Sequence, residues 1–135
     1  MNGIEVALSP GEAIDRLTIL EIKIDRLKDP AKLSIARREH AALAAAIFAR
    51  PAPTTGRVGR LRAALREANE DLWAIEDDIR AFEARGVFDE AFIALARAVY
   101  KTNDRRGALK RAIDREYGAG IHEVKSHDLP DVSDV

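Results

Sequence analysis

Apolar side chains recur every three or four residues over most of the chain, and this spacing predicts α-helices. Stretches that contain proline, glycine and capping residues separate the helical regions. The predicted helices are Pro10–Lys28, Ala31–Ala49, Arg57–Arg85 and Glu90–Tyr117. Before the first of them, apolar residues alternate with others over 4–8, which is typical of a short extended segment.

Four sequence signals support these boundaries. Ser9, Pro10 and Glu12 form a capping box with proline at the first helical position. Asp29 and Pro30 end the first helix and can cap the second, because an aspartate side chain accepts hydrogen bonds from the first free N–H groups of a helix. Gly86 occupies the position where a left-handed residue commonly ends a helix, and Asp89 can cap the helix that follows.

The third and fourth predicted helices carry the most regular pattern, with core positions spaced alternately by four and three residues. These positions are Leu61, Leu65, Ala68, Leu72, Ile75, Ile79 and Phe82 in one helix, and Phe92, Leu95, Val99, Thr102, Arg106, Leu109 and Ile113 in the other. Read in opposite directions, the two series pair Phe82 with Phe92, Leu72 with Thr102 and Leu65 with Leu109. We therefore predict a four-helix antiparallel bundle that contains a long helical hairpin.

Two positions of this hairpin seam are polar, namely Thr102 and Arg106. Arg106 falls opposite the small side chain of Ala68, and a buried guanidinium needs an anionic partner. Winding the first helix at 100° per residue places Glu21 within its apolar arc. We expect a buried Glu21–Arg106 pair, which is either an ion pair that fixes the helix register or the centre of an anion-binding pocket.

Polar and aromatic residues on the flanks of the two long helices could extend such a pocket. They are Trp73, Glu76, Arg80, Tyr100, Asn103 and Lys110. Each also has an ordinary interpretation, because a Glu and an Arg four residues apart form a weak surface pair. Tyrosine and tryptophan likewise often pack on a helix while their polar end remains in water.

Composition limits the classes of function. The 135 residues fit one domain, predicted as 1–120, followed by a polar C-terminal tail over 121–135. With 22 Lys and Arg against 23 Asp and Glu, the net charge of −1 disfavours nucleic-acid binding. A basic start to the third helix, formed by Arg57, Arg60, Arg62 and Arg66, is the one feature that points the other way.

The absence of cysteine excludes thiol catalysis, disulfides and thiolate zinc sites. His122 and His127 are five residues apart, so they cannot share one helix face as a zinc-protease pair does. We therefore expect no metal and no cofactor. No apolar run is long enough to cross a membrane, and we expect a cytoplasmic protein.

Several phrases of the sequence resemble a family of small bacterial proteins that is known only as a domain of unknown function. The phrases are Ser9–Glu12, Ile14–Lys23, Leu72–Arg80, Phe88–Asp89, Leu95–Tyr100, Asn103–Asp104 and Lys125–His127. The resemblance extends from about Ile4 to His127. It implies a short protein that stands alone and whose signature includes charged positions, and it implies no particular activity.

Two functional hypotheses follow from the residues. Ile19 and Ile22 lie on the face of the first helix opposite its main apolar arc, so the second predicted helix, the N-terminal segment or a second subunit must bury them. The last of these favours a non-enzymatic interaction or accessory protein that self-associates or binds another protein. The alternative is a small-metabolite enzyme or binding protein, whose anionic ligand contacts an Arg, Lys and Glu pocket in the bundle. No catalytic residue is assigned.

Overall fold

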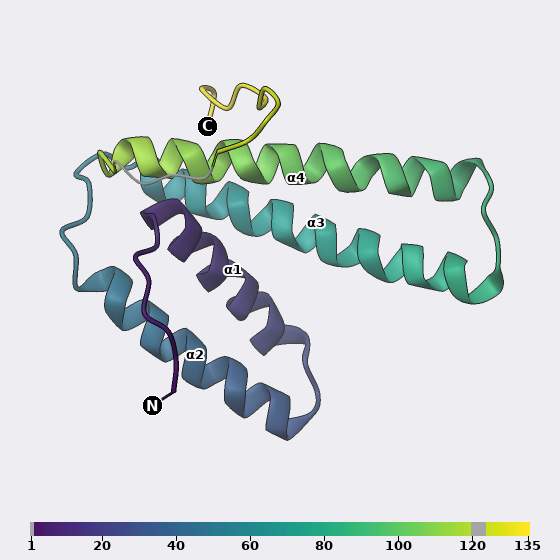
Figure 1. Cartoon of the computed structure of the whole chain (residues 1–135), viewed down its shortest axis with the longest axis horizontal. Helices are drawn as coiled ribbons and strands as arrows, with labels where there is room; N and C mark the ends of the chain where they lie inside the picture. The colour runs from purple at the N-terminus through teal and green to yellow at the C-terminus, as the bar shows by residue number, and fades with distance from the viewer. Residues whose placement is uncertain (1, 120–123) are drawn as a thin grey trace.

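The computed structural model describes residues 2–119 and 124–135, and all regular secondary structure in these residues is α-helical. The helices are α1 (Pro10–Arg26), α2 (Pro30–Phe48), α3 (Arg57–Arg85) and α4 (Glu90–Glu116). In Figure 1, α3 and α4 form a long antiparallel hairpin, and α1 and α2 form a shorter pair beside one half of it. The predicted all-α class is confirmed, whereas His122 and the predicted domain boundary at residue 120 lie outside the described residues.

The helix ends follow the predicted caps. Ser9 Oγ accepts a hydrogen bond from the Glu12 amide at 3.1 Å. Asp29 Oδ1 accepts one from the Ala31 amide at 2.9 Å. Gly86 has φ of 66°, so it ends α3 in the left-handed conformation that glycine adopts without strain.

Helix α1 is the centre of the packing. It contacts α2, α3 and α4, whereas α2 packs against α1 alone among the helices. Residues on more than one side of α1 are therefore buried, and Ile22 is only 2% exposed. Burial of Ile22 therefore requires no second subunit, because α1 is enclosed by its own chain rather than lying at the surface with a single buried face. Ile19 is half-buried.

The start of α1 lies directly against α4. The Gly11 amide donates a hydrogen bond to Asp114 Oδ1 at 2.7 Å. A Cβ atom at residue 11 would lie 2.1 Å from the backbone oxygen of Lys110, a distance that no side chain tolerates. Glycine at this position therefore permits the close approach of the two helices.

The predicted register of the α3–α4 hairpin is confirmed at its closed end. The rings of Phe82 and Phe92 pack edge to face with their centroids 6.3 Å apart. Near the other end, Leu65 and Leu109 are fully buried members of one core cluster, which also contains Ile14 of α1. Direct contact between Leu72 and Thr102, which are both half-buried, stays a prediction.

The C-terminal segment, residues 124–135, returns along α4 (Figure 1). Val132 is 5% exposed and belongs to the core cluster, and Leu129 packs against that cluster. Arg57 of α3 donates a hydrogen bond to the Val132 carbonyl oxygen at 3.3 Å. The polar composition of the segment gives no sign of this packing, and the division into a domain and a tail stays a prediction.

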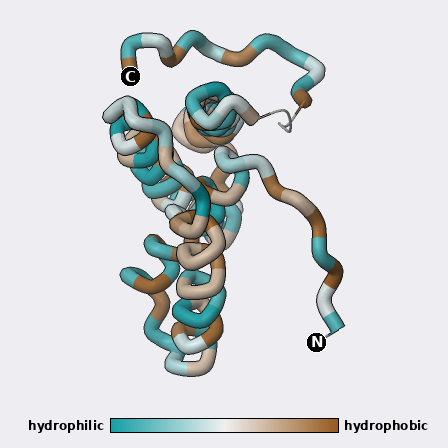
Figure 2. Tube along the Cα trace, turned by 90° about the vertical axis from the view of Figure 1, so that its left-hand side faces the viewer, coloured by the Kyte–Doolittle hydropathy of each residue, from teal (hydrophilic) through white to brown (hydrophobic). Residues whose placement is uncertain are grey.

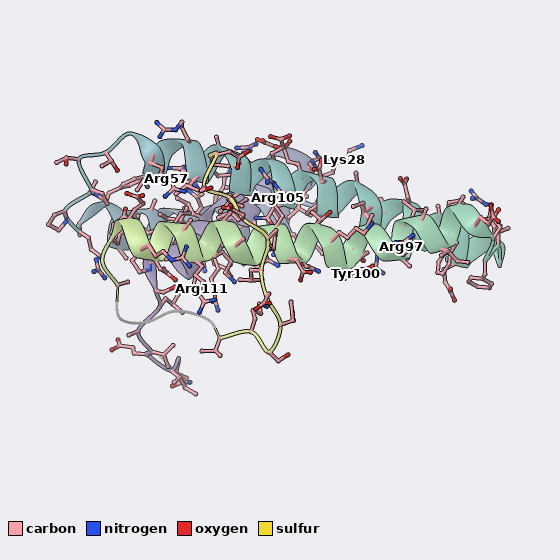
Figure 3. All side chains as sticks on the ribbon, turned by 90° about the horizontal axis from the view of Figure 1, so that it is seen from above. Lys28, Arg57, Arg97, Tyr100, Arg105 and Arg111 are labelled. Atoms are coloured by element: carbon pink, nitrogen blue, oxygen red, sulfur yellow. The ribbon has the colours of Figure 1, made fainter. Side chains whose placement is uncertain are left out.

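The far half of the hairpin, residues 70–106, is packed much less well. None of these residues is buried, and Figures 1 and 3 show no other segment beside the closed end of the hairpin. Phe88 and Ile93 are 57% and 55% exposed. In Figure 2, hydrophobic and hydrophilic residues alternate along the helices that are seen lengthwise, which is typical of amphipathic helices.

Candidate functional site

A buried carboxylate joins three of the helices. Asp15 of α1 is fully buried, and Arg106 of α4 donates hydrogen bonds to its two oxygens from Nε at 2.8 Å and from Nη2 at 2.5 Å. Asn69 of α3 donates to Asp15 Oδ1 and to Thr18 Oγ1, each at 2.9 Å. Thr18 in turn donates to the Asp15 carbonyl oxygen at 2.7 Å. Because a buried charge is tolerated only when it is well paired, this cluster fixes the relative positions of α1, α3 and α4.

The predicted Glu21–Arg106 pair is therefore wrong, although Arg106 does form an ion pair with a buried carboxylate, that of Asp15. The prediction assumed one buried face on α1 and took the acidic residue inside that face. Because α1 is enclosed, the neighbouring face that carries Asp15 and Thr18 is equally buried, and it is this face that meets Arg106.

Glu21 lies instead at the contact between α1 and α3. Its carboxylate accepts hydrogen bonds from Arg62 at 2.7 Å and from Arg66 at 2.9 Å. Arg66 also donates to Glu70 and to Asp25, and these two hydrogen bonds are the main causes that raise the pKa of Arg66 above its ordinary value. This network is partly exposed, so it stabilises the protein only modestly. It also pairs two of the four arginines in the basic start of α3 with carboxylates.

A groove beside α4 gathers four of the predicted site residues. We call it the α4 groove, and its polar lining includes Tyr100, Asn103, Arg106, Lys110, Lys125 and His127. It has a volume of about 550 Å³. Lys125 and His127 belong to a phrase that carried the family resemblance, but their distance from α4 in the sequence gave no reason to place them in this site.

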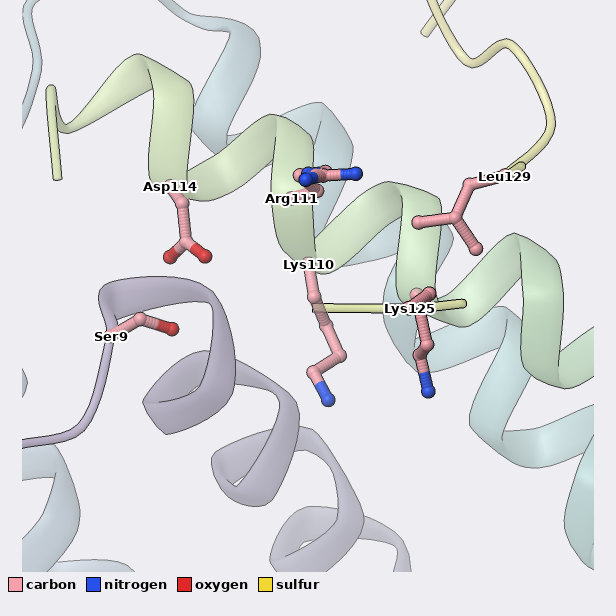
Figure 4. Close-up of a pocket in the computed structure, with 7 residues that line it drawn as sticks. Ser9, Lys110, Arg111, Asp114, Lys125 and Leu129 are labelled. Atoms are coloured by element: carbon pink, nitrogen blue, oxygen red, sulfur yellow. The ribbon is translucent and has the colours of Figure 1, made fainter. Parts of the chain in front are cut away.

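Two carboxylates also line the α4 groove. Glu12 lies 2.7 Å from Lys110 Nζ, and the Lys110 side chain is only 10% exposed. Asp104 Oδ1 lies 2.9 Å from His127 Nε2, which attaches the C-terminal segment to α4. Figure 4 shows the side chains of Lys110 and Lys125 extending beside each other, with their amines on the same side of α4.

The remaining predicted site residues lie elsewhere. Thr102 is half-buried on the hairpin seam, and Glu76 and Arg80 are exposed on α3. The Arg26 guanidinium lies 5.8 Å from the centroid of the Trp73 ring, so Trp73 packs toward the end of α1. None of these four residues lines the α4 groove.

Among the described residues, no group of three or more His, Asp or Glu side chains is arranged to hold a metal ion. None of the described helices combines the length and the apolar character that crossing a bilayer requires.

Comparison with known proteins gives one match. The model of a family of unknown function, DUF6165, matches residues 4–134. Neither a curated protein nor a solved structure matches the chain.

Proposed function

The chain belongs to this family of unknown function, and from its geometry we propose that it is a helical interaction protein that self-associates through the far half of its α3–α4 hairpin. The observation that carries the proposal is that no residue from Glu70 through Arg106 is buried, although most seam positions in this stretch are apolar. The two helices of the hairpin leave this seam only half-buried. Stable helical bundles bury it with three or four helices.

A second copy of the chain is the partner that fits this surface. Two hairpins that pack face to face would complete a four-helix bundle, and a two-fold axis would make the contact closed and symmetric. In that arrangement the half-buried seam would lose its contact with water, and so would the exposed side chains of Phe88 and Ile93. Burying apolar surface in this way is the main favourable contribution to association.

The charges along the far half of the hairpin support the same partner. Along this half, α3 exposes the acidic residues Asp71, Glu76, Asp77, Asp78 and Glu83 against two basic ones, Arg80 and Arg85. Helix α4 exposes the basic residues Arg97, Lys101 and Arg105 against one acidic residue, Glu90. A symmetric pair that places α3 of one copy beside α4 of the other would bring these opposite charges together. Such complementarity favours the specific pairing and its rate of formation.

The test compares two isoleucines of almost equal exposure. Ile93 of α4 is 55% exposed on the hairpin, and Ile35 of α2 is 53% exposed on the other side of the molecule. We expect size-exclusion chromatography with light scattering to give a dimer at micromolar concentration. Ile93→Asp should shift it to a monomer, and Ile35→Asp should leave it unchanged.

Circular dichroism would verify that both variants remain helical. A wild-type protein that stays monomeric at every accessible concentration would contradict the proposal. A dimer that is disrupted by Ile35→Asp and not by Ile93→Asp would also contradict it, because the contact would then lie on α2.

A further inference from the structure

An apolar cavity lies where the N-terminal segment and the start of α1 meet the end of α2 and the end of α4. We call it the α1–α2 cavity, and its lining includes Leu8, Ile14, Leu43 and Ile47. Its volume of about 320 Å³ is at the lower end of the range of small-molecule pockets, which is roughly 300–1,000 Å³. Of its eleven described lining residues, nine are apolar. The lining therefore suits the hydrocarbon part of a small ligand.

The walls of the α1–α2 cavity are fixed by the hydrophobic core. Ile14 of α1 is only 3% exposed, and Pro10 is also buried. Ile47 of α2 and Tyr117, which follows α4, pack against the same core cluster as Ile14. The cavity is therefore formed before any ligand arrives, and a ligand loses apolar contact with water without requiring the core to rearrange.

One charged side chain lines the α1–α2 cavity. Arg50, two residues beyond the end of α2, is exposed, and among the described residues its side chain forms no ion pair and no hydrogen bond. No carboxylate is found among the described lining residues, so the guanidinium is available to an anion from outside the chain. A guanidinium fits a carboxylate especially well, because two parallel N–H groups can each donate to one of its oxygens.

The N-terminal segment gives a ligand access to the α1–α2 cavity. In Figure 1 this segment extends from the start of α1 across α2. Val6, which lines the cavity, is 71% exposed. Among the described residues, no backbone hydrogen bond connects residues 2–8 to another segment. A segment without such bonds moves at a low cost in free energy, so it can shift as a ligand enters.

The length of the α1–α2 cavity limits the length of its ligand. Leu43 and Arg50 lie at opposite ends of the α2 wall, roughly 10 Å apart at a rise of 1.5 Å per residue. Leu43 also lines a wider groove between α1 and α2, whose lining includes the charged residues Lys23 and Glu39. Because an alkyl chain does not compensate the desolvation of charged groups, the chain should end near Leu43.

We propose that the α1–α2 cavity binds a medium-chain fatty acid. Its alkyl chain lies against Ile14, Leu43 and Ile47, and its carboxylate lies beside Arg50. This activity is separate from self-association, because no residue of the far half of the hairpin lines the cavity and one chain supplies every residue that the ligand contacts.

The experiment titrates the full chain with decanoate, decanol and butyrate, below the concentration at which decanoate forms micelles. We expect decanoate to raise Tm, because a ligand that binds only the folded state stabilises it. Decanoate should also shift the NMR signals of amides within residues 7–14 and 43–50. Butyrate should do neither, because it has too little apolar surface to fill the cavity. The same titration of Ile93→Asp separates this result from self-association.

Two pairs of variants locate the two ends of the ligand. Ala46→Trp fills the cavity from an exposed position of α2 and should abolish binding of decanoate and of decanol. Ala45→Trp is its control, because Ala45 is exposed on the same helix and does not line the cavity. Arg50→Gln should weaken binding of decanoate about three- to tenfold and leave binding of decanol unchanged. Arg38→Gln, at an exposed arginine of α2 outside the lining, should change neither.

Four results would overturn the proposal. The first is no change in Tm or in the NMR spectrum with decanoate. The second is equal binding of decanoate to Ala46→Trp and Ala45→Trp, since that would show adsorption to apolar surface in general. The third is an equal effect of Arg50→Gln and Arg38→Gln, since the carboxylate would then lie elsewhere. The fourth is a change of oligomeric state in Ala46→Trp, because the cavity would then be a contact between two copies of the chain.

Discussion

The Asp15–Arg106 pair offers the sharpest test of how the helices are held together. Replacing Arg106 by alanine leaves the Asp15 carboxylate with no solvent exposure and with the Asn69 amide as its side-chain donor among the described residues. Replacing Asp15 by alanine leaves the guanidinium of Arg106, whose side chain is 27% exposed, without its two hydrogen bonds to the carboxylate. Removing one partner of a buried ion pair typically costs about 3 to 5 kcal/mol of the free energy of unfolding.

We expect Arg106→Ala to fall within that range and Asp15→Ala near its lower end, because the stranded guanidinium keeps some contact with water. The double variant should cost about as much as Arg106→Ala alone, so the coupling energy should equal the cost of Asp15→Ala, about 3 kcal/mol. Urea unfolding followed by circular dichroism, at one fixed protein concentration, measures the free energy of unfolding of the wild type, the two single variants and the double variant.

Glu21→Ala is the matched control, because it removes a partly exposed carboxylate from the same helix and should cost about 1 kcal/mol or less. The reasoning fails if the coupling energy between Asp15 and Arg106 is below about 0.5 kcal/mol, the usual limit of additivity. It fails equally if Glu21→Ala destabilises the protein more than Asp15→Ala.

Two further predictions concern the contacts of α1 and α3 with the C-terminal half of α4. Gly11→Ala should destabilise the protein by about 1 to 3 kcal/mol or more in the same urea assay, because the new Cβ would clash with the backbone of Lys110. Gly59→Ala is the control and should stabilise by about 0.5 to 1 kcal/mol, since that position has open space within a helix. Hydrogen bonds from Arg57 and Thr55 hold the pKa of Glu116 below 4.5, so their stabilising effect is present above pH 4.5 and is lost as the pH falls through the lowered pKa. The free energy of unfolding of the wild type should accordingly fall relative to that of Glu116→Gln over this acidic range, and parallel pH curves would contradict the interpretation.

Local features of the fold were predictable because short-range chemistry determines them. Capping by Ser9, Asp29 and Asp89 depends on residues two or three positions away, and the sequence contains both partners. The hairpin register followed from two matching apolar series, and the contact of Phe82 with Phe92 agrees with it.

The polar centre was harder to predict because it depends on how many helices surround α1. An apolar arc identifies one buried face, and Asp15 and Thr18 lie on another face that becomes buried only when both α3 and α4 pack there. Without that information, Glu21 was the reasonable partner for Arg106.

The α4 groove was predicted only in part, for the same kind of reason. Tyr100, Asn103, Arg106 and Lys110 share one helix, so helical spacing could group them. The positions of Glu12, Lys125 and His127 depend on long-range packing of both ends of the chain against α4. No periodic pattern in the sequence records such contacts.

The wide separation of Asp15 and Arg106 along the chain has a consequence for biosynthesis. The two residues are 91 positions apart, so at typical translation rates of about 5 to 20 residues per second Asp15 precedes its partner by roughly 5 to 18 s. During that interval α1 carries an unpaired carboxylate on a face that is later enclosed, and α3 and α4, which are adjacent in the chain, can pair as soon as both have left the ribosome. Helices α1 and α2 are also adjacent in the chain and pack together, so α1 can pair with α2 early, whereas its polar contact with α4 forms only after Arg106 has been made.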